Sequence, residues 1–434
     1  SLLPKQEKMI KRSAGLLVLL LITISLCAQD NKQLQNTFLE AEYFFMNEEY
    51  SEALNYYLQI HSARRDNANI AYCIGVCYLN IPGKKDLAVK YLEDAVKNMS
   101  GKRKEGTINQ VAAPYDALYE LARAYRVNYN FDKAKENFLR YRESLLADDI
   151  DNIEFIDHEI EVCDMAKSLM DKPVTYKMEN LGDLFNDEKP NFYPVISADG
   201  KSFAFMSSLK FYDAIMFCRM QNNKWSDPIN IFPDLKIDGD IRISSLSKDG
   251  KLLFLSKDDN YNSDIYVSSF NGSSWTPAVI LNNNINTKYW ESHACISEDA
   301  NQLIFASDKP GGYGGLDLYI SRKVNGEWGP AVNMGSEINT RFNEDIPFLI
   351  NHDKTLFFSS QGHQNMGGYD LFFSQKKENG TWEKPVNLGY PINTPDDNIY
   401  FMPTGDGSTG YQYFDKGPEG FGKEDIYKII LDKK

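Results

Sequence analysis

Hydrophobic and polar residues follow two different periods along this chain. Over residues 33–172, apolar side chains recur every three or four positions, the spacing that gathers them on one face of a helix. Over residues 174–434, apolar runs are short and are separated by Gly, Asn and Asp, as in strands connected by tight turns. The pattern changes at Pro173, a residue type that ends helices. We therefore predict an α+β multidomain protein, with a helical domain over 33–172 followed by a β domain over 174–434.

The helical domain contains three helix pairs with small and aromatic residues at matching places. Ala41 and Gly75 are equivalent in the first two pairs and lie 34 positions apart. Small residues let paired helices approach each other, and aromatic residues fill the space between pairs, so stacked pairs bury a continuous core. The matching positions are Ala41, Phe44, Ala53 and Tyr57, then Gly75, Tyr78, Ala88 and Ala95, then Ala122, Tyr125, Ala134 and Phe138.

These positions resemble the tetratricopeptide (TPR) family, and an unrelated helical bundle is the alternative. The resemblance implies an α-solenoid whose concave groove holds a helix or an extended segment of a partner protein. Tyr43, Tyr72 and Tyr115 are candidate groove residues, and core packing is the alternative place for them.

The β domain repeats a unit of about 50 residues. Each unit has a turn of the type Ser197–Lys201 (Ser-Ala-Asp-Gly-Lys), an apolar strand, an aspartate that begins another strand, and a tryptophan followed closely by proline. A unit of this length with about four short strands is typical of a β-propeller blade. The repeated residues are Asp213, Asp264, Asp317, Asp370 and Asp425, and Trp225, Trp275, Trp328 and Trp382. Because they recur at the same place in each unit, we interpret them as structural rather than catalytic.

The last unit lacks the tryptophan, the proline and the strand that follows them. A matching strand, Val174–Leu181, stands at the front of the β domain instead. Pairing this strand with the last unit removes two exposed sheet edges, which would otherwise promote aggregation. We therefore predict a five-bladed β-propeller that is closed by its N-terminal strand.

The repeated Ser-x-Asp-Gly-Lys turn, the apolar strand and the Asp-Leu/Ile-Tyr sequence resemble WD40-like propeller repeats of the TolB type. Asp264, Asp317 and Asp425 each begin a matching tripeptide, whereas Asp213 does not, which leaves the first blade the least regular. The order of leader, TPR array and propeller is similar to that of envelope proteins of the Bacteroidota, some of them in type IX secretion and gliding machinery. Some of those proteins continue into an OmpA-like domain, and we expect no such domain here.

Residues 1–28 have the order of a secretory leader. A basic pair precedes an apolar run from Ala14 to Leu26, which is followed by Cys27 and Ala28. A basic start, a short apolar run and a small residue are typical of a signal peptide, and the run is short for a membrane span. We predict cleavage after Ala28 and a periplasmic or outer-membrane-associated protein without a membrane span in its mature form. Lipidation of Cys27 is the alternative, although Leu26 is larger than a lipidation site favours.

The formal net charge of −14 argues against a nucleic-acid partner, because nucleic acids are bound mainly through Lys and Arg. Sequence motifs for phosphate binding or for a serine nucleophile are absent. Asp258, Asn260, Asn262 and Asp264 alternate as calcium ligands do, but the glycine and distal glutamate of an EF-hand are missing. We interpret this segment as a loop at the edge of a blade and expect no cofactor, with calcium binding as the alternative.

Polar residues near the start of each predicted innermost strand could line the central channel. The candidates for a ligand site there are Asp240, Glu291, His293, Glu344 and Asp397. Such a ring would suit a cation or a basic peptide, and solvated loop ends are the alternative interpretation. We predict a non-catalytic scaffold that binds other envelope proteins. A propeller hydrolase of the lactonase or glycan-processing type, using the acidic channel, is one alternative, and a glycan or muropeptide sensor is another.

Overall fold

The computed structural model describes residues 31–432 except 260 and 416, so the predicted leader and Cys27 lie outside the described residues. The chain divides into two compact units between Ile160 and Glu161, inside helix α7. The change from helix to strand falls between Met170, where α7 ends, and Tyr176, where the first strand begins.

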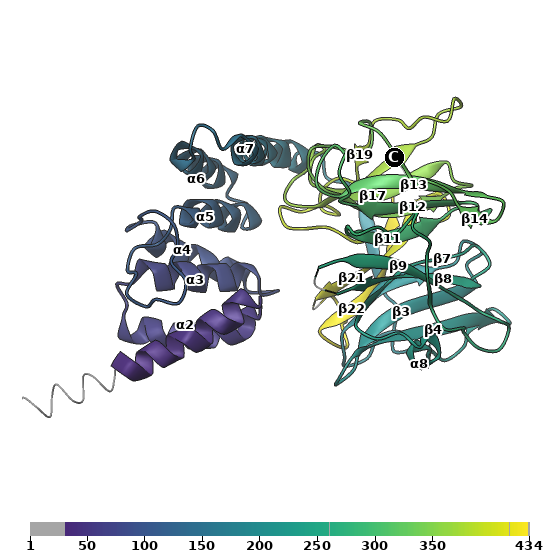
Figure 1. Cartoon of the computed structure of the whole chain (residues 1–434), viewed down its shortest axis with the longest axis horizontal. Helices are drawn as coiled ribbons and strands as arrows, with labels where there is room; N and C mark the ends of the chain where they lie inside the picture. Colours follow the sequence, from purple (N-terminus) through teal and green to yellow (C-terminus); the bar gives the residue numbers. More distant parts are fainter. Residues whose placement is uncertain (1–30, 260, 416, 433–434) are drawn as a thin grey trace, which may run out of the picture. The chain divides into compact units, whose positions relative to one another are not determined.

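Helices make up the first unit (Figure 1). Residues 31–46 are helical, and the helices that follow are α2 (Tyr50–Ala63), α3 (Ala68–Leu79), the short 3₁₀ helix η1 (Lys85–Leu87), α4 (Ala88–Ala95), α5 (Asp116–Val127), α6 (Phe131–Ser144) and α7 (Ile150–Met170). Helices that are consecutive in sequence pack together from α2 to α6. Gly75 of α3 is needed for this packing, because a Cβ there would lie 2.4 Å from the Cγ of Leu92 on α4. The assignment of these helices to the TPR family stays a prediction.

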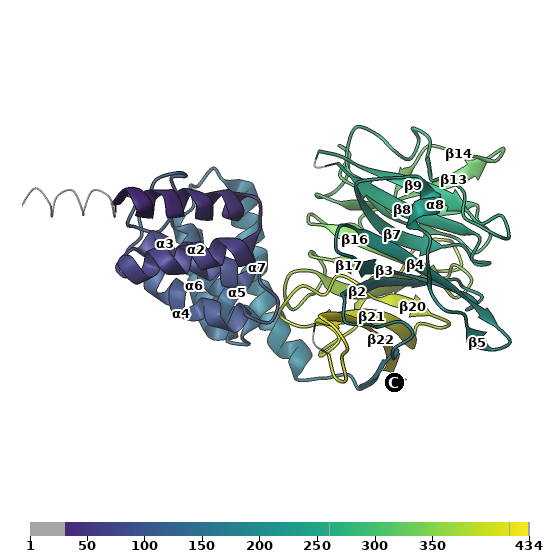
Figure 2. The same cartoon turned by 90° about the horizontal axis from the view of Figure 1, so that it is seen from below.

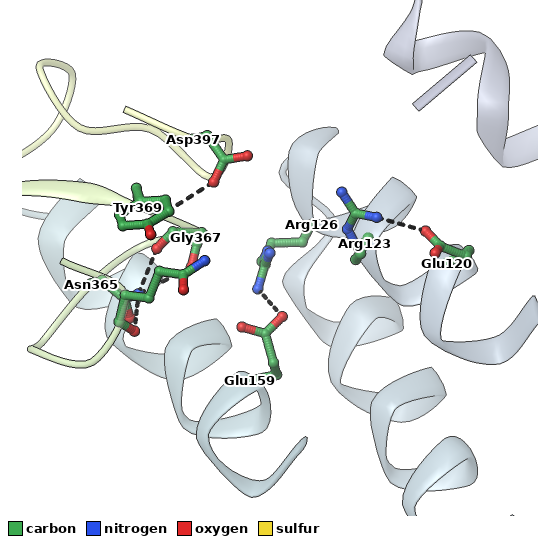
Figure 3. Close-up of polar contacts among 10 residues, drawn as sticks. Glu120, Arg123, Arg126, Glu159, Asn365, Gly367, Tyr369 and Asp397 are labelled. Carbon is green, nitrogen blue, oxygen red and sulfur yellow. Dashed lines mark hydrogen bonds and ion pairs between the residues drawn. The ribbon is translucent and has the colours of Figure 1, made fainter. Parts of the chain in front are cut away.

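Two buried ion pairs hold the helical unit together. Glu42 accepts hydrogen bonds from Arg103, from the hydroxyl of Tyr57 at 2.5 Å and from the backbone N–H of Gly106 at 3.2 Å. This carboxylate therefore fastens the inserted segment between α4 and α5 to the first two helices. Arg126 on α5 donates to Glu159 on α7 at 2.6 Å (Figure 3).

The second unit is a five-bladed β-propeller, as predicted (Figure 2). Blade 1 contains β2 (Asn191–Ile196), β3 (Ser202–Ser208), β4 (Asp213–Gln221), β5 (Lys224–Trp225) and β6 (Ile229–Asn230), and helix α8 (Phe232–Leu235) follows it. Blade 2 contains β7 (Asp240–Leu246), β8 (Leu252–Asp258), β9 (Ser263–Ser269) and β10 (Val279–Ile280). Blade 3 contains β11 (Glu291–Ile296), β12 (Gln302–Ser307), β13 (Asp317–Val324), β14 (Glu327–Trp328) and β15 (Val332–Asn333).

Blade 4 contains β16 (Glu344–Ile350), β17 (Thr355–Ser360), β18 (Asp370–Gln375) and β19 (Val386–Asn387). Blade 5 contains β20 (Met402–Thr404), β21 (Thr409–Asp415), β22 (Glu424–Leu431) and β1 (Tyr176–Asn180). The innermost strands contact one another in the circular order β2, β7, β11, β16, β20 and back to β2. The fifth blade is completed by the N-terminal strand, because β1 pairs antiparallel with β22 from Tyr176↔Leu431 to Asn180↔Tyr427. This is the closure that the sequence predicts.

Apolar side chains fill the space between blades, and the outermost strands are short. The main core includes Phe217 and Trp275, whose rings pack where the first two blades meet, and Phe203, whose ring packs against Trp225 of its own blade and Tyr411 of blade 5. The outermost strands β6, β10, β15 and β19 have two residues each. Such short edges offer little backbone for pairing with another chain.

Candidate functional site

Two of the predicted channel residues are buried glutamates that bond within the fold. Glu344 accepts hydrogen bonds from the backbone N–H and the hydroxyl of Thr340, both at 2.7 Å, and from the hydroxyl of Ser360 at 2.7 Å. Glu291 has the same three kinds of donor in blade 3. Burial raises the pKa of both carboxyl groups, and that of Glu344 reaches about 7. Each glutamate therefore ties the turn before an innermost strand to the second strand of its blade.

Asp240 and Asp397, the other two predicted acidic channel residues, each lie one residue before the position equivalent to these glutamates. In blade 3, Glu291 stands opposite Ser307 of the second strand. The equivalent pair of blade 2 is Ile241 and Lys257, so Ile241 occupies the position of the glutamate. In blade 5 the equivalent residue is Asn398, whose side chain accepts the N–H of the threonine four positions earlier, as Glu344 does. Asp240 is exposed and pairs with Arg242.

Asp397 instead stabilises a glycine-rich loop. Its carboxylate accepts the N–H of Tyr369 at 2.9 Å, and the neighbouring Asn365 side chain donates to the carbonyl of Gly367 at 3.1 Å (Figure 3). Gly368 is required at this place, because a Cβ there would lie 1.9 Å from the Asp397 Oδ1 atom. The glycines between the second and third strands thus allow close contact with the turn that leads into the next blade.

His293 lies in the innermost strand β11 and is buried. Its Nδ1 atom is 3.0 Å from the Oδ1 atom of Asp345 in the neighbouring innermost strand β16. The Asp345 carboxylate also accepts the N–H of Ile346 at 2.8 Å. This pair joins the innermost strands of blades 3 and 4.

The repeated aspartates differ from blade to blade in what they contact. Asp317, Asp370 and Asp425 are fully buried, and each accepts at least one backbone N–H from the loop before it. Asp213 is exposed and accepts a hydrogen bond from the hydroxyl of Ser208 at 2.6 Å. In blade 2, burial and the nearby Asp259 raise the pKa of Asp264, the remaining aspartate of the series.

The segment with alternating calcium-type ligands is arranged as a hairpin loop. Asp258 pairs with Arg242 at 3.1 Å, and Asp259 closes the turn by accepting the N–H groups of Tyr261 and Asn262. Asn260 lies outside the described residues. Within residues 31–432, leaving out 260 and 416, no group of three or more His, Cys, Asp or Glu side chains is placed to hold a metal ion.

A cavity of about 760 Å³ opens at the other ends of the innermost strands. Its lining comes from all five blades, at the turns that join the first strand of each blade to the second. We call it the five-turn cavity, and its lining includes Ile196, Asp199, Leu246, Lys248, Ile296, Glu298, Phe348, His352, Met402 and Asp406. The floor is apolar and the rim is charged. The sequence pattern of these turns predicts hairpins and does not by itself indicate a cavity.

The charges on one side of the rim neutralise one another. Glu298 pairs with Lys248 at 2.7 Å, and its carboxylate lies 3.2 Å from the Nδ1 atom of His352. These contacts lower the pKa of Glu298, with the Lys248 hydrogen bond as the largest cause. They also connect the turns of blades 2, 3 and 4 across the rim.

Lys428 lines the cavity where it reaches the seam between blades 5 and 1. It pairs with Tyr411, the third residue of the second strand of blade 5. At the equivalent place the other blades have Phe217, Val267, Ile320 and Phe373. Lys428 is half-buried beside Trp225 in the cavity lining, and no ion-pair partner for its amine is recorded within the described part of the chain. It is therefore a cation at a place where the other blades have an apolar side chain, buried in the case of Phe217 and half-buried in the other three.

The three candidate groove tyrosines of the helical unit lie in different environments. Tyr43 is 61 % exposed and Tyr115 is 43 % exposed. Tyr72 instead packs against a cluster of small residues that includes Ala68 and Ala117. Only the first two offer aromatic surface to a partner in this unit.

No protein-family model and no curated protein matches this sequence. Solved structures to which the propeller is similar include TolB from Acinetobacter baumannii, at 15 % identity and a TM-score of 0.37, covering 57 % of this chain and 55 % of that one. An α-L-arabinofuranosidase from Lactobacillus brevis matches at 14 % identity and 0.40, covering 58 % and 92 %. An aldose sugar dehydrogenase from Streptomyces coelicolor matches at 9 % and 0.30, covering 60 % and 99 %.

The chain therefore spans about half the length of the first of these proteins. Because propellers of such different activity match at low identity, the likeness concerns the fold alone. None of the described helices is long and apolar enough to cross a membrane.

Proposed function

We propose that this protein is a non-catalytic scaffold whose propeller binds an extended segment of another protein in the five-turn cavity. The observation that carries the proposal is the construction of this cavity from the turns of all five blades. An apolar floor under a polar rim is the usual composition of a binding site, because burial supplies affinity and a few polar groups fix orientation.

Lys428 defines the chemistry that the segment should present. The half-buried amine of Lys428 has no ion pair within 4 Å among the described residues, although the exposed Glu179 stands opposite it on β1, and it favours a carboxylate close to it. Trp225 and Tyr411 line the same part of the cavity and offer apolar surface for the side chains next to that carboxylate. The segment should therefore combine an acidic group with apolar residues.

The hydrogen bonds of the glutamates favour a scaffold over a hydrolase. Glu291 and Glu344 are fully buried, and their carboxylates accept hydrogen bonds from the fold itself. A general acid or base must reach a substrate directly or through one water molecule. The export of the protein to the cell envelope, and a role there in secretion or outer-membrane assembly, follow from the predicted leader and from the family resemblance, and belong to the same proposal.

A photo-crosslinker placed in the cavity tests the scaffold proposal. Benzoylphenylalanine at Thr409, which lines the cavity, should give a discrete adduct with one polypeptide in cells that express the protein naturally. The matched control is Val332, an exposed residue in the outermost strand of blade 3. Adding Lys428→Glu should remove the adduct at position 409, because it replaces the cation by a carboxylate.

Equal adduct formation at positions 409 and 332 would contradict binding in the cavity. Turnover of aryl glycosides or lactones by the full chain, abolished by Glu344→Gln, would favour the hydrolase instead. An adduct with a glycan rather than a polypeptide would favour the sensor.

A further inference from the structure

Tryptophan side chains fill the seams of the propeller in a regular way. One cross-strand pair in each blade is relevant to these seams. It joins the third residue of the second strand to the residue opposite it on the third strand. The tryptophan of the next blade packs beside this pair. Trp275 of blade 2 lies beside Phe217 of blade 1, with ring centroids 5.1 Å apart.

The other seams with a tryptophan follow the same rule. Trp328 of blade 3 belongs to the cluster that contains the blade 2 pair, Phe254 and Val267. Trp382 of blade 4 belongs to the cluster that contains the blade 3 pair, Ile304 and Ile320. Trp225 of blade 1 shares the five-turn cavity with the blade 5 pair.

The seam between blades 4 and 5 has the apolar pair but a cavity in place of the tryptophan. Phe357 and Phe373 form this pair, and their rings are stacked with centroids 5.7 Å apart. They line a cavity of about 430 Å³, which we call the seam pocket. Val174, Val386, Leu388 and Leu431 complete its apolar lining.

The topology of blade 5 explains why this site is open. Its outermost strand is β1, which follows helix α7 in the sequence and precedes all the other strands. Pro173 precedes this strand, as Pro228, Pro277, Pro330 and Pro385 follow the four tryptophans. In blades 1 to 4 the tryptophan stands two or three positions before its proline. The residues at these two places before Pro173 are Asp171 and Met170, at the end of α7. The chain therefore supplies no indole at the fifth place.

We propose that the seam pocket receives an aromatic side chain, with an indole as the best fit, from a partner protein. Equivalent apolar pairs in this propeller are covered by an indole, so the pocket has a lining suited to one. The undescribed residues, 1–30, 260, 416 and 433–434, include no Phe, Tyr or Trp, and so cannot supply the ring themselves.

Charge adds a second feature of the occupant. Asp406 and Asp432 line the seam pocket, and none of its described lining residues is cationic. A Lys or Arg next to the aromatic residue of the partner would complement these two carboxylates. This inference shares with the proposed function the premise that the propeller binds a protein, but it concerns a separate site.

The test uses N-acetyl-tryptophanamide as the probe and methyl NMR of the full chain as the readout. We expect saturable shifts at the methyl groups of Val174, Val386, Leu388 and Leu431, with a dissociation constant on the order of 1 mM. Val386→Trp should fill the pocket and abolish these shifts. Val332→Trp is the matched control, because Val332 has the same place in blade 3, beside a seam that Trp382 already fills, and it should leave the shifts unchanged.

Three results would overturn the inference. One is a set of shifts that persists in Val386→Trp, and another is equal binding of N-acetyl-leucinamide, which would show a pocket without preference for aromatic rings. The third is self-association of the full chain in sedimentation that Val386→Trp removes, which would make a second copy the occupant. The crosslink at position 409 reports on the five-turn cavity independently, so failure at one site is distinguishable from failure at the other.

Discussion

The pH dependence of stability should change when Glu344 is replaced by glutamine. Burial raises the pKa of this carboxyl group from 4.5 to about 7 in the folded protein. Between these two pH values the folded state holds a proton that the unfolded state has released. Stability from this group is therefore fully present below about pH 4.5 and is lost as the pH rises to about 7.

The size of the effect follows from the shift. Integrated between pH 5 and pH 8, at about 1.4 kcal/mol per pKa unit, the shift makes the loss about 2.5 kcal/mol. For a unit of this size, 1 kcal/mol changes the melting temperature by about 2–4 °C. Glutamine keeps the shape and can bond to Thr340 and Ser360 without a charge.

Melting temperatures of the wild type and Glu344→Gln at pH 5 and pH 8 give the measurement. The melting temperature of the variant, relative to that of the wild type, should rise by about 5–10 °C between the two pH values. Glu337→Gln is the control for the change of side chain itself, because Glu337 is exposed in the turn before the same strand. A pH-independent difference for Glu344→Gln would refute the reasoning.

Three further substitutions test other contacts. Arg103→Met leaves the Glu42 carboxylate buried without its cation, and should cost the helical unit about 3–5 kcal/mol in urea titrations followed by circular dichroism; an unchanged midpoint would contradict this role. Asp317→Ala removes the acceptor of two backbone N–H groups and should lower the free energy of unfolding of the propeller by about 2–3 kcal/mol. Asp213→Ala should leave the unfolding midpoint unchanged, and equal destabilisation by the two substitutions would argue against the difference in burial. Lys428→Ile should raise the melting temperature while lowering the crosslink yield in the five-turn cavity, and an unchanged yield would remove Lys428 from the binding site.

The architecture of the propeller could be predicted because its signals are local and repeated. Each blade has its own turn, aspartate and tryptophan, so the period and the number of blades follow from counting. The missing tryptophan in the last unit indicated the closing strand, and the pairing of β1 with β22 confirms it. The seam pocket is a consequence of that same missing residue.

The candidate site was harder to predict because it depends on which residues of different blades face the axis. A shift of one residue turns a strand side chain to the other face, and Asp240 and Asp397 stand one residue away from the positions of the two buried glutamates. The five-turn cavity does have a signal in the sequence. Lys428 stands in a column of apolar residues, and a blade-by-blade alignment of the sequence would have shown it.

The pairing of β1 with β22 also decides when the propeller can finish folding during synthesis. Asn180 and its partner Tyr427 are separated by nearly the whole propeller, so the first strand leaves the ribosome long before its partner exists. At about 5–20 residues per second, the wait is roughly 12–50 s. During that time four blades can assemble beside an unpaired strand, and this interval is when the nascent chain most needs a chaperone.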